Sequence, residues 1–172
     1  AYAVDERNAL ALIDQYADIG VKAIGLVWNH ENKLGGGAES SGDLSPLGKL
    51  VIEKMEQRKI ILDVSHMNQR TFWSSLAMSK APVIASHSGA FALTPHLRNL
   101  TDDQILAIAK NGGVINVVFH RAFIGHPKDA SIADVADHIQ YICKLVGPKF
   151  VGIGSDFDGS DTQIGRASCR ER

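Results

Sequence analysis

Lys59-Ile-Ile-Leu-Asp-Val64 is a nearly continuous apolar run of strand length, and Ser65 and His66 follow it directly. A strand that is covered by helices on both faces needs such a run, whereas a half-exposed strand alternates apolar and polar residues. Four more runs of this kind occur along the chain, at 22–27, 82–85, 113–119 and 150–153. Together the five runs predict five parallel strands.

Helical segments with recognisable ends separate these runs. Ser45 followed by Pro46 fits a helix N-cap with a proline in the first turn. Thr101-x-x-Gln104 and Ser131-x-x-Asp134 resemble capping boxes, and Asn111-Gly112-Gly113 fits the end of the helix between them. Strands that alternate with helices predict the α/β class, either as an open parallel sheet or as a (β/α) barrel.

Composition and charge argue against several classes of protein. The 172 residues are 45% hydrophobic and 22% charged, which is a globular composition. The formal net charge of -1 gives no electrostatic reason to expect a nucleic acid or an anionic membrane as partner. The longest apolar runs are strand-sized, so no membrane segment is expected in this chain. Cys143 and Cys169 are too few for a disulfide scaffold. The glycine-rich segment 34–38 lacks the Lys-Ser/Thr of a phosphate-binding loop, so it is predicted to be a flexible loop.

Each predicted strand ends near a side chain that can bind a metal, a proton or a ligand. These side chains are His30, His66, His87, His120 and Asp156. Binding sites of parallel α/β folds lie at the carboxyl ends of the strands, because the following loops and helix N-termini converge there. Imidazole suits zinc-like metals, so the pattern is compatible with a metal site in which Asp156 is an oxygen ligand or base. From the residues alone, hydrogen-bonded core histidines and a helix-capping Asp156 are the alternative.

Several segments between Ile24 and Gly159 form a specific series when they are taken in order. They are Leu26-Val-Trp-Asn-His-Glu-Asn32, Leu44-Ser-Pro-Leu-Gly48, Ile61-Leu-Asp-Val-Ser-His-Met67, Ala81-Pro-Val-Ile-Ala-Ser-His-Ser88, Arg98-Asn-Leu-Thr-Asp102, Gly112-Gly-Val-Ile-Asn116 and Val151-Gly-Ile-Gly-Ser-Asp-Phe-Asp-Gly159. With this series the chain resembles the membrane dipeptidase (renal dipeptidase) family of zinc peptidases. The resemblance implies an amidohydrolase-type (β/α)8 TIM-type barrel with two zinc ions, whose bridging hydroxide attacks the peptide bond of a dipeptide.

The resemblance also implies roles for individual residues. His66 and His87 match the two histidines that ligate the second zinc. Asp156 matches the acid that holds the bridging water and passes its proton to the leaving amine, and a carboxylate beside two metal ions suits that task. Arg98 matches the residue that binds the free carboxylate of the substrate, for which a guanidinium fork is well shaped.

Two departures from the family pattern bear on these roles. The substrate-polarising histidine of the family falls at Trp28 here, so His30, two residues further on, is the candidate for that contact. The His-x-Asp ligands of the first zinc and the bridging Glu are not visible in the sequence. The resemblance therefore predicts a fragment: about five of eight barrel strands over residues 1–163, inactive alone, with at most one metal site partly present.

Two further expectations concern the ends and the partners of the chain. The last nine residues, 164–172, match an in-frame translation of a sequencing-library adapter and are predicted to be a non-native tail. A dipeptide substrate and a homodimer are expected of the intact protein.

Other functions remain open at this level. Another amidohydrolase-type metal hydrolase would act on a different amide, lactam or ester, but Arg98 argues against a substrate without a carboxylate. A non-catalytic metal- or ligand-binding domain, or an inert truncated product, is the alternative from another class. Counting bound metal ions would separate these hypotheses.

Overall fold

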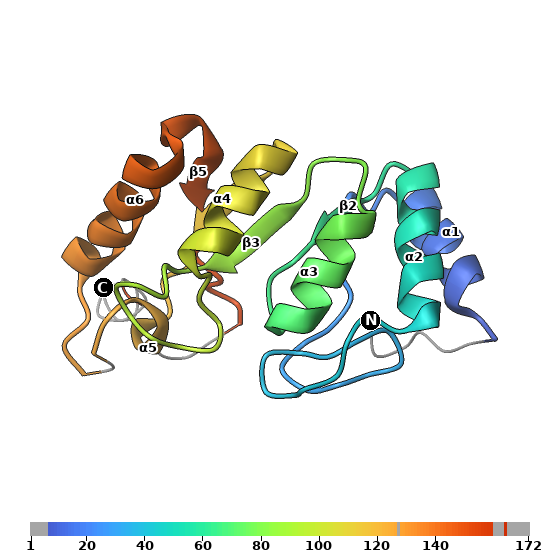
Figure 1. The fold of residues 1–172 in the computed structure, drawn as a ribbon, viewed down its shortest axis with the longest axis horizontal. Helices are drawn as coiled ribbons and strands as arrows, with labels where there is room; N and C mark the ends of the chain where they lie inside the picture. Colours follow the sequence, from blue (N-terminus) through green and yellow to red (C-terminus); the bar gives the residue numbers. More distant parts are fainter. Residues whose placement is uncertain (1–6, 127, 160–163, 165–172) are drawn as a thin grey trace, which may run out of the picture. The chain divides into compact units, whose positions relative to one another are not determined.

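The computed structural model describes residues 7–126, 128–159 and 164. The chain forms two compact units, Ala1–Ile84 and Ala85–Arg172. Figure 1 shows the helices and strands of each. None of the helices in the described part of the chain has the length and apolar character needed to cross a bilayer.

In the first unit, helices alternate with two short strands and the start of a third. Its elements are α1 (Ala9–Asp18), β1 (Ala23–Gly25), α2 (Pro46–Gln57), β2 (Ile61–Asp63) and α3 (Gln69–Met78). β1 and β2 pair in parallel, with Ala23 opposite Ile61 and Gly25 opposite Asp63. Asp63 also pairs in parallel with Ile84, the first residue of β3 (Ile84–Ser88).

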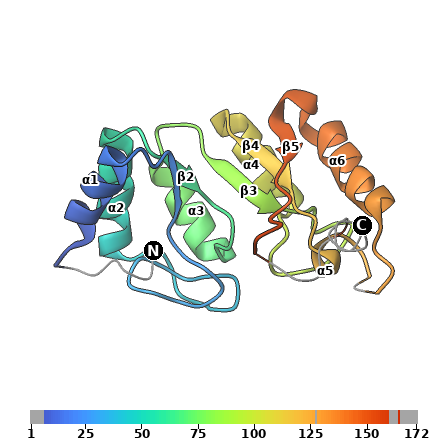
Figure 2. The ribbon, with the colours of Figure 1, turned by 180° about the vertical axis from the view of Figure 1, so that it is seen from behind.

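The second unit holds the rest of β3 and continues the same alternation. Its other elements are α4 (Asp102–Asn111), β4 (Val114–Val117), α5 (Arg121–Ile124), α6 (Ile132–Val146), the 3-10 helix η1 (Pro148–Phe150) and β5 (Val151–Ile153). β4 and β5 pair in parallel from Ile115–Val151 to Val117–Ile153, and Figure 2 shows them side by side. The strand order is β1-β2-β3-β4-β5, so the predicted α/β fold with a parallel sheet is confirmed.

The helix ends follow the local sequence signals. The Ser45 hydroxyl accepts a hydrogen bond from Gly48 N–H, with Pro46 as the first helical residue of α2. Complete capping boxes begin α4 and α6, at Thr101 and Ser131. α4 ends at Gly112, whose φ of 85° is in the left-handed region that glycine enters without steric cost.

Each unit has a core made from one face of its helices and from its strands. Fully buried side chains of the first unit include Ile13, Leu26, Val51, Met55 and Phe72. Those of the second unit include Ile105, Ile108, Ile115, Val117 and Ile142. Burying a side chain of this size contributes about 1.5–3 kcal/mol each before the loss of conformational entropy is counted.

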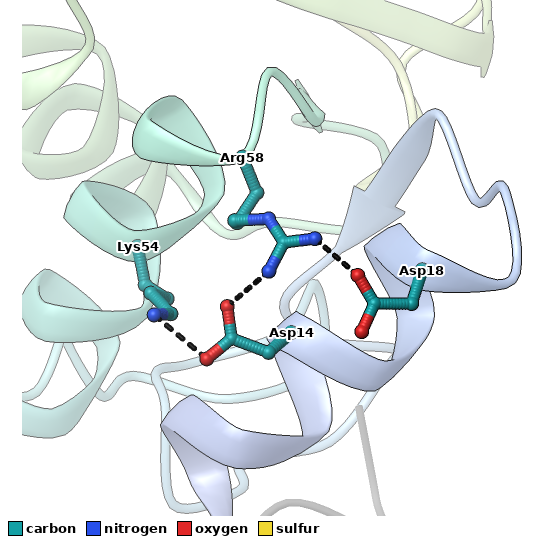
Figure 3. A network of polar contacts seen from close by, with 4 residues as sticks. All are labelled: Asp14, Asp18, Lys54 and Arg58. Carbon is teal, nitrogen blue, oxygen red and sulfur yellow. Dashed lines mark hydrogen bonds and ion pairs between the residues drawn. The ribbon is translucent and has the colours of Figure 1, made fainter.

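An ion-pair network joins α1 to α2 on the surface of the first unit (Figure 3). The Asp14 carboxylate lies 2.7 Å from Lys54 Nζ and 2.6 Å from a guanidinium nitrogen of Arg58. The second terminal nitrogen of Arg58 donates to Asp18. Arg58 therefore bridges two carboxylates that are one helical turn apart on α1.

The structure differs from the sequence-based expectations in three places. The third strand covers Ile84–Ser88 instead of 82–85, so His87 lies within the strand and not after it. The apolar spacing in residues 5–19 predicts a helix with Leu10 and Ile13 on the same side, but in α1 only Ile13 of the two is buried and Leu10 is 42% exposed. Of the predicted tail 164–172, all residues except Ile164 lie outside the described residues.

The third difference is the glycine-rich segment 34–38, which is a loop but a buried one. Gly36 N–H donates to Thr71 Oγ1 at 2.9 Å. A Cβ on Gly37 would lie 1.8 Å from the Trp28 carbonyl oxygen. Close approach of two backbones, and not flexibility, is the reason for glycine here.

Candidate functional site

His66 stands directly after β2 in a turn that its neighbours hold. Asp63 Oδ1 accepts a hydrogen bond from Ser65 N–H at 3.0 Å, which closes the turn at the end of the strand. The imidazole Nδ1 of His66 lies 2.9 Å from Asn29 Oδ1. Asn29 Nδ2 in turn donates to Glu39 Oε1 at 3.0 Å, so the amide oxygen faces the ring. This pairing puts the His66 proton on Nδ1 and the lone pair on Nε2, the form in which a histidine binds a metal.

Backbone strain coincides with two of the predicted site residues. Among the described residues, only three non-glycine residues have positive φ: Lys59 at 55°, His66 at 69° and Asp156 at 57°. This conformation is uncommon for residues with a side chain and costs on the order of 1–2 kcal/mol. Strain of this kind concentrates at functional sites, so its presence at His66 and Asp156 supports their selection as site residues.

Trp28 and His30 both follow β1, but they have different neighbours. The Trp28 ring lies 6.1 Å from the His66 ring, centroid to centroid, and its side chain is 53% exposed. His30 Nδ1 lies 3.5 Å from Glu39 Oε2, with both side chains largely exposed. Glu39 thus links His30 to the Asn29 amide that orients His66.

In the second unit, His87 and Arg98 share a backbone contact. His87 Nδ1 lies 2.7 Å from Ser86 Oγ on β3. Arg98, which is only 5% exposed, donates from Nη2 to the His87 carbonyl oxygen at 3.4 Å. Its guanidinium carbon stands 5.4 Å from the centre of the Phe123 ring, within cation–π range.

Phe123 is the centre of a small aromatic cluster beside Arg98. The His120 ring stacks on it at 4.1 Å with an angle of 22°, and the His96 ring lies 4.4 Å away. His96 Nδ1 also accepts a hydrogen bond from the backbone N–H of Arg98 at 3.2 Å. We call Arg98, His96, His120 and Phe123 the Arg98 cluster.

His120, a member of the Arg98 cluster, has a perturbed pKa. Burial lowers the pKa of His120, and the positive charges of His96 and Arg98 lower it further, whereas Asp156 raises it. The net direction is downward, so His120 is neutral at neutral pH. Arg98 thus disfavours the charged form of His120, and Asp156 favours it.

Asp156 lies in the turn that follows β5. Its carbonyl oxygen accepts a hydrogen bond from Gly159 N–H at 3.0 Å, and its φ of 57° makes the chain turn sharply after the strand. Aspartate is one of the few residues that tolerate this conformation. Phe157, next to it, packs edge-on against Phe119 at 5.7 Å.

In the second unit, Arg98 contacts the His87 carbonyl and shares the Phe123 ring with His120, and Asp156 lies in the turn after β5. His66, Trp28 and His30 belong to the first unit. Among residues 7–126, 128–159 and 164, no three His, Cys, Asp or Glu side chains gather in a group that could hold a metal ion. The described residues therefore do not complete a metal centre by themselves. The sequence assigned no role to Asn29 or Phe123, because their partners, His66 and Arg98, are distant from them along the chain.

Comparison with known proteins gives the family. The model of the membrane dipeptidase family, peptidase family M19, matches residues 1–167. The chain belongs to this family. An uncharacterised dipeptidase of Schizosaccharomyces pombe is 42% identical over 161 residues, which cover 88% of this chain and 38% of that protein. The dipeptidase aclJ of Aspergillus oryzae is 34% identical over 158 residues, covering 88% of this chain and 37% of aclJ.

Solved structures agree with the fold. An amidohydrolase from Pseudomonas aeruginosa matches with a TM-score of 0.84 at 29% identity, over 90% of this chain and 48% of its own. A metallo peptidase from Rhodobacter sphaeroides, bound to a phosphinate mimic of the dipeptide L-Ala-D-Ala, matches with a TM-score of 0.84 at 27% identity. That match covers 93% of this chain and 52% of the peptidase. The chain spans about two-fifths to one-half of the length of these four relatives.

Proposed function

We propose that these residues belong to a metallo-dipeptidase that hydrolyses dipeptides with a free carboxyl terminus. The observation that carries the proposal is the buried Arg98, whose guanidinium is held between the His87 carbonyl and the Phe123 ring in the unit that also contains Asp156. Family membership and the dipeptide mimic bound to the Rhodobacter sphaeroides relative support the same substrate class.

Arg98 is the proposed anchor for the substrate carboxylate. A guanidinium offers two parallel N–H donors that match the two oxygens of a carboxylate. Burial keeps water away from the pair and strengthens the attraction. An anchor at the carboxyl end, at a fixed distance from the reacting bond, also favours dipeptides over longer peptides.

Asp156 is the proposed general base and acid. Its carboxylate takes a proton from the attacking water as the water oxygen bonds to the peptide carbon, and it gives that proton to the amine nitrogen as the C–N bond breaks. The products are then two free amino acids. The proposal follows the family resemblance, and the strained backbone of Asp156 supports it.

We propose roles for three histidines as well. His66 and His87 are two ligands of the metal centre, for which zinc is the expected metal because imidazole nitrogen suits it. His30 donates a hydrogen bond to the carbonyl oxygen of the scissile bond. Two zinc ions per enzyme and a homodimer are proposed for the intact protein.

The test compares two substrates in the complete protein that carries these residues. One is a dipeptide with a free carboxylate, and the other is the same dipeptide with a carboxyl-terminal amide. Arg98→Ala is expected to raise KM for the free dipeptide by roughly 10- to 100-fold, which corresponds to the loss of a charged hydrogen bond, and to leave the amide nearly unaffected. Arg98→Lys serves as the matched control, because it keeps the charge and loses the fork.

Metal analysis of the same samples tests the ligand roles. His66→Ala is expected to lose bound zinc together with activity, whereas Arg98→Ala keeps its zinc. Equal effects of Arg98→Ala on both substrates would overturn the carboxylate anchor. Full zinc content in His66→Ala would overturn the ligand assignment.

A further inference from the structure

The loop between β3 and α4, residues 89–100, carries Arg98 and is closed at its base. Leu100 N–H donates to the Gly89 carbonyl oxygen at 2.9 Å, and Phe91 N–H donates to the Leu100 carbonyl oxygen at 2.8 Å. Ala90 and Leu100 form a parallel bridge. We call this segment the Arg98 loop. Its two ends are tied to each other, so its conformation depends on what holds its interior.

Asn99 holds the interior of the Arg98 loop with both ends of its side-chain amide. Its Oδ1 accepts a hydrogen bond from Gly89 N–H at 2.9 Å. Its Nδ2 donates to the Thr94 carbonyl oxygen at 2.8 Å and to the Phe123 carbonyl oxygen at 2.6 Å. The residue is 6% exposed, so water does not replace these bonds easily.

His138 fastens the other side of the Arg98 loop to α6. Its Nδ1 accepts a hydrogen bond from Ala90 N–H at 2.9 Å, so the ring proton is on Nε2. Nε2 lies 3.3 Å from Thr94 Oγ1. His138 is 1% exposed, and both of its ring nitrogens face polar groups of the Arg98 loop.

We propose that Asn99 and His138 are positioning residues for Arg98: they fasten the Arg98 loop so that the guanidinium is held ready for the substrate carboxylate. This inference rests on the proposed function of Arg98. Asn99 acts most directly, because it follows Arg98 in the chain and is bonded to the carbonyl of Phe123, whose ring supports the guanidinium. One amide therefore fixes both the backbone of Arg98 and the ring beside its charge.

The role of His138 requires the neutral ring. The charged groups that act on it are Asp134 and Asp137, both on α6, and they raise its pKa. The Arg98 loop contributes the Thr94 hydroxyl and α5 contributes the Ile124 carbonyl, neither of which titrates. Burial outweighs these effects and lowers the pKa. A proton added at Nδ1 would face the Ala90 N–H, so acid is expected to release this fastening.

The kinetic test uses Asn99→Ala in the complete protein. It is expected to raise KM for a free dipeptide about 10-fold and to leave kcat nearly unchanged, because the anchor is misplaced while the reacting groups stay intact. In an Arg98→Ala background the same substitution should have no further effect on KM. Tyr141→Phe is the matched control: it removes the hydrogen bond between α6 and Asp102 and should leave KM unchanged.

The inference would be wrong if the increase of KM in the double variant equalled the product of the increases in the two single variants, since Asn99 would then act independently of Arg98. An unchanged KM in Asn99→Ala would overturn it as well. If that variant does not fold, His138→Leu replaces it with the same expectations, because it removes the acceptor for Ala90 N–H and keeps the bulk of the side chain.

Hydrogen exchange separates this inference from the proposed function. His138→Leu is expected to raise the exchange rate of the Ala90 amide, whereas His138→Asn restores protection because its Oδ1 can accept the same hydrogen bond. His138→Asn should also remove the acid-induced loss of Ala90 protection that is expected of the wild type, because asparagine does not titrate. Unchanged exchange in His138→Leu overturns the fastening itself. Altered exchange without any preference for a free carboxylate supports the fastening and overturns only the role of Arg98.

Discussion

At the scale of single residues, the candidate site is marked by backbone strain and by polar partners. His66 and Asp156 both have positive φ, and their side chains belong to two different compact units. Lys59 has the same conformation without any functional neighbour, so strain alone does not define the site. The surroundings of the two residues add further support: Asn29 orients the His66 ring, and the charge of Asp156 raises the pKa of His120 against the effect of burial.

Asp156→Asn is the sharpest single substitution. Asparagine tolerates positive φ as well as aspartate does, so the turn after β5 should persist. The amide cannot take the proton of the attacking water, and kcat is expected to fall by ~10²–10⁴-fold with little change in KM. Steady-state kinetics of the complete protein, with zinc content measured beside it, provide the test.

The neighbouring Asp158→Asn is the matched control, since it removes an exposed carboxylate two residues away. It should keep full turnover. If Asp156→Asn kept full turnover with its metal bound, the proton-transfer role would be wrong even though the family assignment would stand.

Residue types at the ends of strands could be predicted from the sequence, but their partners could not. The positions of His66 and Asp156 after apolar runs follow from the chain itself. Asn29 reaches His66 from 37 residues away, and Phe123 supports Arg98 from a helix of four residues. Such contacts depend on how loops close, and no periodicity in the sequence encodes them.

At the scale of elements, the chain directly after β5 approaches β3 more closely than a side chain would allow. A Cβ on Gly154 would lie 1.8 Å from the Ser86 carbonyl oxygen and 2.8 Å from Asn116 Cβ. Gly154 N–H also donates to the Val117 carbonyl oxygen at 3.0 Å. Glycine at this position therefore lets the chain turn toward Asp156 directly beside the residue that precedes His87.

Gly154→Ala is expected to destabilise the protein by about 1–3 kcal/mol, because the backbone must shift to relieve the overlap. The shift would move Asp156, so kcat should fall as well. Chemical denaturation and steady-state kinetics give the two measurements. Gly25→Ala at the end of β1 is the control, since a Cβ on Gly25 would lie 3.8 Å from the nearest heavy atom. A loss of stability as large as that of Gly154→Ala would contradict the steric explanation.

The ion-pair network between α1 and α2 should contribute modestly and depend on salt. Hydrogen bonds from Lys54 and Arg58 lower the pKa of Asp14, although burial acts in the opposite direction. Asp14→Asn is therefore expected to lower Tm slightly at low ionic strength and hardly at all in concentrated salt, because exposed pairs are screened. Thermal unfolding at two salt concentrations measures this. Glu53→Gln on α2 is the control, because the ion pairs of the network join only Asp14, Asp18, Lys54 and Arg58. An equal Tm loss at both salt concentrations would contradict an electrostatic origin.

The presence and type of the helices and strands could be predicted better than the residues at which they end. Capping signals at Ser45, Thr101 and Ser131 each begin a helix as expected, because caps depend on three or four neighbouring residues. The third strand extends to Ser88 because pairing in the sheet, and not hydrophobicity, decides where a strand ends. The prediction of a flexible loop at 34–38 was wrong, because the residues that cover this loop, such as Thr71, are distant in sequence.

At the scale of the whole molecule, the fold class and family follow from the order of motifs along the chain. Five strands were predicted and five form the sheet. The solved relatives are matched over about half of their length, which agrees with the expectation of about five of the eight barrel strands. The division into two compact units was not predicted, because no linker or change of composition accompanies the boundary inside β3.

The two units are expected to respond differently to acid. In the second unit, burial lowers the pKa of His120 and of His138, so the unfolded chain binds more protons than the folded one as the pH falls below about 6.5. Stability is therefore complete above that pH and decreases below it, by up to about 2 kcal/mol for His138 at pH 5. In the first unit, hydrogen bonds lower the pKa of Asp14 and Asp43, so their contribution is lost only as the pH falls below about 4.

Hydrogen exchange of core amides, corrected for the intrinsic pH dependence of exchange, tests this difference. Between pH 7 and pH 5, protection is expected to decrease at Ile115 and Ile142 and to stay nearly constant at Val51 and Leu62. His138→Asn should reduce the decrease in the second unit, because asparagine does not titrate and keeps an acceptor for Ala90 N–H. Equal losses of protection in both units over this range would mean that they unfold as one cooperative body, and the buried histidines would then control the acid stability of the entire chain.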